Sequence, residues 1–158
     1  MYIVEGGLDD PRVVELVLTH LRRALSVTPR GSAHALDLSG LRVPEITFWS
    51  AWEGAGDDAA LVGVGALKTL SGDHGEVKSM HTAEGARGRG VGSAVLRHII
   101  AEARARGMTR LSLETGAFDY FAPARALYAR HGFEACAPFG DYRPDRNSVF
   151  LTLALPAR

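Results

Sequence analysis

The first regular pattern of apolar residues lies near the N-terminus. Four of them recur at intervals of three or four residues, the spacing of one helical face: Val14, Leu18, Leu21 and Leu25. Asp10 and Pro11 just before this run suit an N-cap and a first helical position. The pattern predicts a helix from Pro11 to about Ser26, followed by a short second helix or an ordered loop over 31–41.

Three strand-like runs follow this helix. They are rich in β-branched, aromatic or apolar residues and lie at 46–53, 60–70 and 76–82. The segments between them are short and rich in glycine and aspartate, which is typical of turns. Short turns between consecutive strands favour antiparallel pairing, so the three runs predict a meander.

The spacing becomes helical again after Gly90. Six apolar residues mark one face of a long helix that Gly107 ends: Val91, Val95, Leu96, Ile99, Ile100 and Ala103. The remaining chain predicts a strand at 111–115, a helix at 124–130 and two strands near 133–137 and 148–155. This order of elements predicts an α/β (α+β) domain built on one twisted sheet.

Composition narrows the classes of protein that fit. A chain of 158 residues with 46% apolar and 23% charged residues suits a single globular domain spanning 1–158. No run reaches the roughly 20 apolar residues of a membrane span, and the net charge of zero argues against nucleic acid as a partner. The single cysteine, Cys136, excludes an internal disulfide and favours a reducing compartment, so we expect a cytoplasmic protein.

The segment 82–92 (TAEGARGRGVG) joins a predicted strand to the long helix. Its glycines leave the backbone open, and the N–H groups at the start of a helix carry the positive end of its dipole. Arg87 and Arg89 add positive charge there. This combination predicts a binding site for phosphate or pyrophosphate.

Two common phosphate-binding motifs do not fit this segment. A dinucleotide fingerprint that starts at Gly88 requires glycine where the chain has Ser93. A P-loop requires a lysine before a serine or threonine, and this segment contains no lysine. Both motifs are therefore excluded. The glycines either bind a different kind of phosphate ligand or only form a tight entry to the helix.

Arg87 to Gly92 resembles the Arg/Gln-x-x-Gly-x-Gly/Ala signature of the Gcn5-related N-acetyltransferases (GNAT). Residues 124–133 resemble a second pattern of that family, A-x-x-L-Y-x-x-x-G-F. With the strand that precedes the first motif, the resemblance covers 76–133. The resemblance implies a mixed, mostly antiparallel twisted sheet of six to seven strands flanked by helices. One position departs from it, because Phe121 stands where many members have an asparagine that contacts the cofactor.

The same resemblance implies acetyl-CoA as the acyl donor, without a metal. Its pyrophosphate would bind the backbone of Arg87, Gly88, Arg89, Gly90, Val91 and Gly92. Its pantetheine arm would lie along Met80, His81 and Thr82, where two strands diverge. The backbone N–H of Met80 would then hold the thioester oxygen as negative charge develops on it. Strand alternation places the His81 side chain on the opposite face from that of Met80.

Acyl transfer also needs groups that move protons. By position in the family pattern, Tyr128 would donate to the leaving thiolate. An attacking ammonium must lose a proton, and the candidate bases are Glu76, which begins the cofactor-binding strand, and Glu114 on the next strand. A metal site at His74, Glu76 and His81 lacks a closed ligand set, and Cys136 has apolar neighbours that suit a structural thiol. We therefore expect direct transfer in a ternary complex.

The acceptor should bind opposite the cofactor, between the first helix and the meander. Candidate lining residues are His34, Trp49, Asp141 and Tyr142. Carboxylates outnumber lysines near these segments, which favours a small cationic amine such as an amino acid. A protein lysine as acceptor and a non-catalytic acyl-CoA-binding module are the alternatives. Exposed strand edges near the C-terminus make a homodimer possible.

Overall fold

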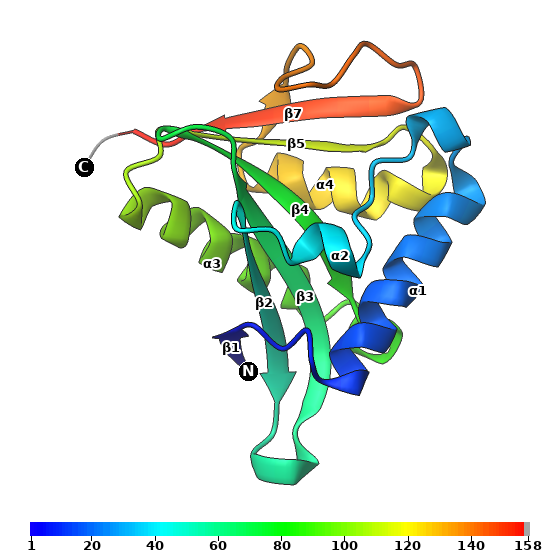
Figure 1. Cartoon of the computed structure of the whole chain (residues 1–158), viewed down its shortest axis with the longest axis vertical. Helices are drawn as coiled ribbons and strands as arrows, with labels where there is room; N and C mark the ends of the chain where they lie inside the picture. The colour runs from blue at the N-terminus through cyan, green and yellow to red at the C-terminus, as the bar shows by residue number, and fades with distance from the viewer. Residues whose placement is uncertain (157–158) are drawn as a thin grey trace.

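The computed structural model describes residues 1–156 and contains one seven-stranded sheet (Figure 1). The strand order is β1-β2-β3-β4-β5-β7-β6. The strands are β1 (Tyr2–Glu5), β2 (Ile46–Glu53), β3 (Ala60–Thr69), β4 (His74–Thr82), β5 (Arg110–Gly116), β6 (Glu134–Ala135) and β7 (Ser148–Ala154). Neighbouring strands are antiparallel except β4 and β5, which confirms the mixed, mostly antiparallel sheet.

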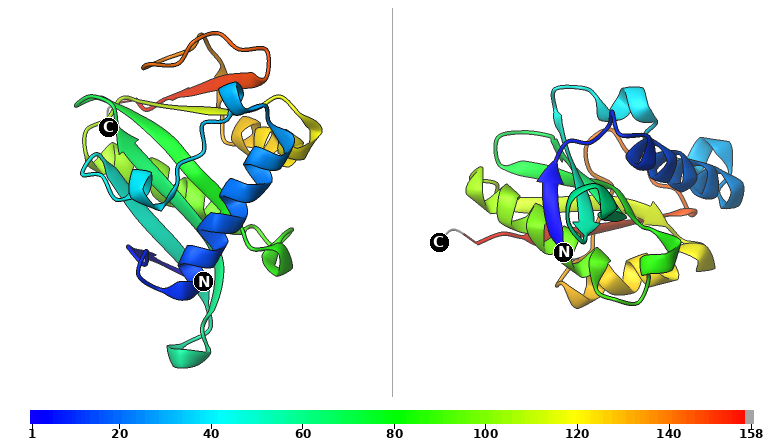
Figure 2. Two further views of the ribbon diagram at one scale, coloured as in Figure 1. Left: turned by 45° about the vertical axis from the view of Figure 1, so that its right-hand side comes forward. Right: turned by 90° about the horizontal axis from the view of Figure 1, so that it is seen from below.

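Four α-helices cover the two faces of this sheet (Figures 1 and 2). They are α1 (Pro11–Val27), α2 (Leu38–Leu41), α3 (Val91–Ala105) and α4 (Ala122–Arg130). Helices α1 and α2 lie on one face, and α3 and α4 lie on the other. Each face buries its own apolar cluster against the strands, so the sheet forms the middle layer of three.

Helix α1 begins as predicted, but its buried face is shifted. The Asp10 carboxylate accepts the backbone N–H of Arg12 and caps the helix. Val13, Val17 and Ala24 are buried against the sheet, whereas Leu25, predicted to be on the apolar face, is 48% exposed. The predicted stripe is therefore wrong in part, because smaller residues occupy the true contact face. His20 falls on that same face, seven residues after Val13.

Helix α3 matches its prediction closely, since all six residues of its predicted apolar face are buried. Gly90 caps it with φ of 82°, a left-handed conformation that glycine adopts without strain. Gly107, beyond the other end, has φ of 81°. Glycine thus sets both ends of the helix that carries the predicted phosphate site.

Two strands differ from the sequence prediction. Strand β1, which pairs with β2, was not predicted, because four residues at a chain end give too little alternation to recognise. The strand predicted near 133–137 shrinks to the two residues of β6. The chain from there to β7 instead forms a long connection over the sheet, and Tyr142 lies within it.

Strands β4 and β5 separate along their length, which is the feature that positions the site. They pair only at His74, Gly75 and Glu76, whose partners are Arg110, Leu111 and Ser112. Beyond Glu76 the strands diverge, and Figure 1 shows β4 running away from β5 toward α1. The splay implied by the family resemblance is present.

Candidate active site

Two cavities meet at the splay between β4 and β5. The larger, of about 400 Å³, lies beside the N-terminus of α3, and the smaller, of about 110 Å³, lies between β4, β5 and α1. Five residues line both cavities: His20, Met80, Phe121, Ala124 and Tyr128. A group bound in one cavity can therefore reach a group bound in the other at this shared wall.

The larger cavity has the features of a phosphate-binding cradle. Gly88 and Gly90 line it with φ of 76° and 82°, and a Cβ added at either would meet no atom within 4 Å. The first N–H groups of α3, from Val91 on, lack partners within the helix and carry its positive dipole end. Arg87 and Arg130 also line the cavity. These residues fit the pyrophosphate and the adjoining arm of an acyl-CoA.

Most of the residues predicted to bind the cofactor line this cavity: Met80, His81, Thr82, Arg87, Gly88, Gly90, Val91 and Gly92. Arg89 is the one that the structure places elsewhere. Its Nη1 lies 3.0 Å from Oε2 of Glu53, in an ion pair on the surface. We therefore leave Arg89 out of the proposed cradle.

A β-bulge in β4 decides which side chains face each cavity. Val64 pairs with His81 and Ala66 with Lys78, so β4 has one residue more than β3 between these pairs. Ser79 lies in this bulge with φ of 55°. The Met80 side chain packs toward α3, where its sulfur lies 3.1 Å from the position of a Cβ added at Gly65. His81 points the other way, toward α1, as strand alternation predicted.

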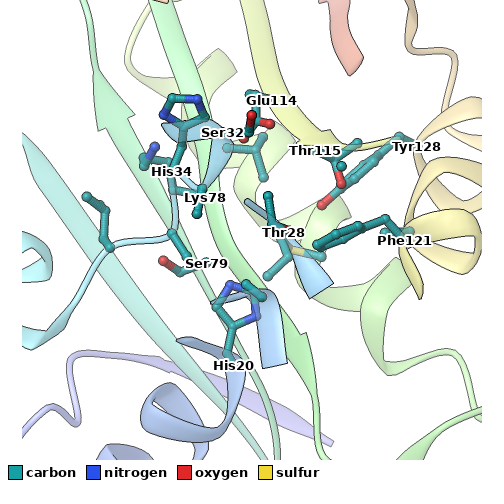
Figure 3. Close-up of a pocket in the computed structure, with 18 residues that line it drawn as sticks. His20, Thr28, Ser32, His34, Lys78, Ser79, Glu114, Thr115, Phe121 and Tyr128 are labelled. Carbon is teal, nitrogen blue, oxygen red and sulfur yellow. The ribbon is translucent and has the colours of Figure 1, made fainter. Parts of the chain in front are cut away.

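Tyr128 stands where the two cavities meet. It lies on α4, is 6% exposed and packs against Phe133 with ring centroids 5.7 Å apart. Burial, with Glu114 contributing, raises the pKa of Tyr128 far above its usual value of 10. The phenol is therefore protonated at neutral pH and can donate a hydrogen bond into the shared space (Figure 3).

Glu76 lies in a buried polar cluster with Lys78 and Tyr142. It is 2% exposed, and its Oε2 accepts from Nζ of Lys78 at 3.2 Å and from the Tyr142 hydroxyl at 2.5 Å. Lys78 Nζ also donates to the Tyr142 oxygen at 3.0 Å. Glu76 does not line either cavity, whereas Lys78 lines the smaller one. This arrangement gives Glu76 a role in holding Lys78 and Tyr142.

Replacing Glu76 with alanine is expected to destabilise the protein by about 3–5 kcal/mol, because the buried Lys78 charge loses its counter-ion. Urea denaturation of the variant and the wild type measures this difference. The control replaces both partners, Glu76→Leu with Lys78→Met, and should recover much of the lost stability. A loss below about 1 kcal/mol in Glu76→Ala would contradict a buried, mutually dependent pair.

Glu114 remains as the carboxylate that faces the smaller cavity. It lies on β5 beyond the paired segment, where the strands have already diverged. Burial raises the pKa of Glu114 above its usual value of 4.5. A carboxylate with a raised pKa accepts a proton more readily than an exposed one.

The structure separates the four predicted acceptor residues. His34 lines the smaller cavity (Figure 3). Its ring meets that of Tyr142 edge-on, with centroids 5.0 Å apart. Tyr142 contacts the cavity indirectly, through Lys78. Trp49 is 3% exposed in the core beside His98, and Asp141 is exposed in a turn. We leave Trp49 and Asp141 out of the proposed site.

Phe121 occupies the family's asparagine position and lies over a glycine. A Cβ added at Gly116 would come within 2.1 Å of the Phe121 ring, so residue 116 must lack a side chain for the ring to lie there. The Arg125 guanidinium donates to the carbonyl oxygens of Gly116 and Phe118, which fixes the turn between β5 and α4. Phe121 thus forms part of the wall that the two cavities share.

Among the titratable residues that line the smaller cavity, the sequence did not indicate two, His20 and Lys78. A signal for His20 existed in the sequence, because the 3–4 spacing from Val13 and Val17 places it on a buried helical face. Lys78 lies in β4 beside the bulge, which the sequence did not indicate, and its partner Tyr142 is 64 residues away. Spacing along the chain carries no information on such a distant contact.

Residues 1–156 also bear on three further features: a metal site, a reactive cysteine and a membrane span. No group of three or more His, Cys, Asp or Glu side chains in this range could hold a metal ion. Cys136 lines neither of the two cavities, and burial raises the pKa of its thiol. None of the helices in the described range is long and apolar enough to cross a membrane.

Comparisons with known proteins identify acetyltransferases as relatives of this chain. The family model for the acetyltransferase (GNAT) family matches residues 17–133. The N-acetyltransferase YsnE of Bacillus subtilis is 52% identical over 98% of this chain and 100% of its own length. The N-acetyltransferase YedL of Escherichia coli is 49% identical over 97% of this chain and 94% of its own length.

Solved structures agree with these relatives. A putative acyl-CoA N-acyltransferase from Klebsiella pneumoniae has a TM-score of 0.73 at 26% identity and covers 98% of this chain and 97% of its own. A GNAT family acetyltransferase from Elizabethkingia anophelis with acetyl-CoA bound has a TM-score of 0.68 at 17% identity, with coverage of 98% and 97%. With its splayed strands, its glycine cradle and these close relatives, the chain belongs to the GNAT family of acetyltransferases and is an acyltransferase.

Proposed function

We propose that the protein transfers an acetyl group from acetyl-CoA directly to the primary amine of a small molecule. The observation that carries this proposal is the shared wall of the two cavities, where Met80 and Tyr128 face both of them. A donor in the larger cavity and an acceptor in the smaller one would meet there. Direct transfer then needs no acyl-enzyme, in keeping with the position of Cys136 outside both cavities.

In this proposal the glycine cradle, Met80 and Tyr128 each act on a different part of the donor. The backbone of Gly88, Gly90 and the first turn of α3 binds the pyrophosphate of the donor. The backbone N–H of Met80 stabilises the negative charge that develops on the carbonyl oxygen. Tyr128 donates a hydrogen bond to the leaving thiolate, which keeps its electron pair as the carbon–sulfur bond breaks. A thiolate has an ordinary pKa near 8.5, well below that of Tyr128, so the phenol stabilises it without giving up its proton.

The smaller cavity suits a cationic amine of modest size. Its volume of about 110 Å³ limits the part of the acceptor that can enter. Glu114 supplies a carboxylate there, while the charge of Lys78 is balanced by Glu76. We assign Glu114 the attraction of the ammonium and the removal of its first proton, which frees the lone pair for attack.

Two other functions remain possible outcomes of an experiment. A protein lysine would present a similar ammonium, but on a four-carbon stem attached to a bulky backbone. A non-catalytic acyl-CoA-binding module would keep the larger cavity and need no polar acceptor site. Glu114, His34 and Lys78 around the smaller cavity favour an enzyme that binds a polar small molecule.

An amine panel tests the proposal. Wild-type protein is mixed with acetyl-CoA and single amines: the amino acids, short polyamines and a lysine-containing peptide. Free CoA thiol released with a small amine, together with intersecting initial-rate lines over both substrates, is the expected result. Release with the peptide alone would favour a protein acceptor. Parallel lines would indicate an acyl-enzyme. A melting temperature raised by acetyl-CoA, without thiol release, would favour the binding module.

A further inference from the structure

Two histidines from distant parts of the chain form a pair at the shared wall. Nδ1 of His20 on α1 lies 3.1 Å from Nδ1 of His81 on β4, with ring centroids 5.0 Å apart. His20 lines both cavities, and His81 lines the larger one. The pair has no part in the mechanism described so far.

The bulge in β4 and the shifted face of α1 create this pair. If β4 ran through the same residues without the bulge, strand alternation would turn His81 toward α3, away from α1. His20 lies on the helical face that Val13, Val17 and Ala24 press against the sheet. Both deviations from simple patterns thus bring two imidazoles together on a mostly apolar surface.

The short distance between the two Nδ1 atoms restricts their protons. One hydrogen bond between two ring nitrogens needs one proton, so one ring donates and the other accepts. If both rings were doubly protonated, two N–H groups would oppose each other. Burial lowers the pKa of His20 to about 4 and that of His81 to about 3, with Arg23 and Arg87 among the charges that lower the latter. Both rings are therefore neutral at pH 7.

A neutral pair leaves one ring nitrogen of His20 for the cavity. Within residues 1–156, the bond to His81 is the hydrogen bond that the His20 ring makes, and it uses Nδ1. Nε2 is left for a ligand. If the Nδ1 proton belongs to His20, Nε2 has a free lone pair at the wall that both cavities share.

The proposed transfer requires a base of this kind in addition to Glu114. An ammonium has to lose two protons to become an amide nitrogen: one before attack and one as the new bond forms. Glu114 lies on β5 in the smaller cavity alone, whereas His20 borders both cavities. The second proton is released at the point where acceptor and donor meet.

We propose that His20 is a catalytic base for the second proton, with Nε2 as the accepting atom, and that His81 is the positioning residue that fixes its tautomer. This assignment rests on the proposed function. As the nitrogen–carbon bond forms and the carbon–sulfur bond breaks, Nε2 of His20 takes the proton from the nitrogen. The resulting imidazolium keeps its Nδ1–H on Nδ1 of His81. It then releases the Nε2 proton to the thiolate or to water, which restores the neutral pair for the next turnover.

Nitrogen NMR of the histidine rings tests the pair without any acceptor. At pH 7, ¹⁵N-labelled wild type should show His20 protonated at Nδ1 and unprotonated at Nε2, and His81 unprotonated at Nδ1. The single variants His20→Gln and His81→Asn assign the signals. A proton on Nε2 of His20 with none on Nδ1, or a charged His20 at pH 7, would overturn the proposal, because no lone pair would face the cavity.

Kinetics test the catalytic role, with the panel amine that wild type acetylates fastest as the acceptor. His20→Gln should lower kcat/KM by about 100-fold or more, the usual range for a general base, with acetyl-CoA affinity by calorimetry changed less than about threefold. Imidazole added to His20→Ala should restore activity in proportion to its concentration. A rate for His20→Gln within threefold of wild type, with chemistry limiting, would remove His20 from the reaction.

The matched pair His81→Ala and His81→Asn separates positioning from structure. Asparagine can place its carbonyl oxygen close to where Nδ1 lies and accept the His20 proton, whereas alanine cannot. His81→Ala should lower kcat about tenfold or more with KM little changed, and His81→Asn should recover most of that loss. Equal losses in both variants would reject the positioning role. If wild type acetylates no amine of the panel, the proposed function fails, and the NMR result still decides the state of the pair.

Discussion

Replacing Gly90 with glutamate is expected to abolish acetyl-CoA binding. Gly90 lines the larger cavity at the N-terminus of α3, and a side chain there would project into space that is open in the structure. The new carboxylate would also place negative charge where the pyrophosphate is proposed to bind. Calorimetry with acetyl-CoA should give no measurable heat for a folded variant.

Gly107→Glu is the matched control for this experiment. Gly107 has nearly the same φ, 81° against 82°, and a Cβ there would also meet no atom within 4 Å, but it lies at the other end of α3. Both variants should therefore carry similar backbone strain. Gly107→Glu should retain acetyl-CoA affinity. Unchanged affinity in a folded Gly90→Glu protein would contradict the proposed cradle.

Replacing Tyr128 with phenylalanine is expected to lower kcat by about 10²–10⁴, because the leaving thiolate loses its hydrogen-bond donor. The ring is buried and packs against Phe133, so the fold and most of the acetyl-CoA affinity should remain. Steady-state rates with the best panel amine, combined with calorimetry, measure both quantities. Since burial raises the pKa of Tyr128 well above 10, its ionisation should add no limb to the pH–rate profile between pH 7 and pH 9.

Tyr2→Phe provides the control, since Tyr2 is 43% exposed on the edge strand β1. Its rate should equal that of wild type. A Tyr128→Phe rate within about twofold of wild type, with chemistry shown to limit turnover, would exclude Tyr128 from the mechanism.

The sequence was sufficient for the elements with long or well-marked patterns. The helix after Gly90 and strands β2 and β3 could be predicted because apolar spacing, glycines and turns all agree there. The face of α1 could not, since the residues that touch the sheet include alanine and histidine, while Leu25 faces outward. Side-chain size and hydrophobicity alone do not reveal which face the rest of the fold covers.

The two cavities of the site also differ in how far the sequence predicts them. The cradle around Gly90 is a local feature of the segment 82–92, so the sequence and the family resemblance predict it together. The smaller cavity depends on contacts between residues far apart in the chain, such as Tyr142 with Glu76 and His20 with His81. The sequence therefore led to Glu114 and His34 but not to His20 and Lys78, and it placed Trp49, a core residue, in the acceptor site.

The single extra residue in β4 has a consequence for how related chains are compared. Before the bulge, even-numbered residues such as Glu76 and Lys78 face α1, and after it the odd-numbered His81 does so. Loss of the extra residue near Ser79 would leave His81 on its present face, because His81 would still pair with Val64. A strand that ran through the same residues without the bulge would instead exchange the two faces after Lys78. A related chain could then keep every side chain of this segment and still present a different set to its acceptor. The bulge, and not the order of side chains alone, thus decides which residues of β4 lie on each face of the sheet.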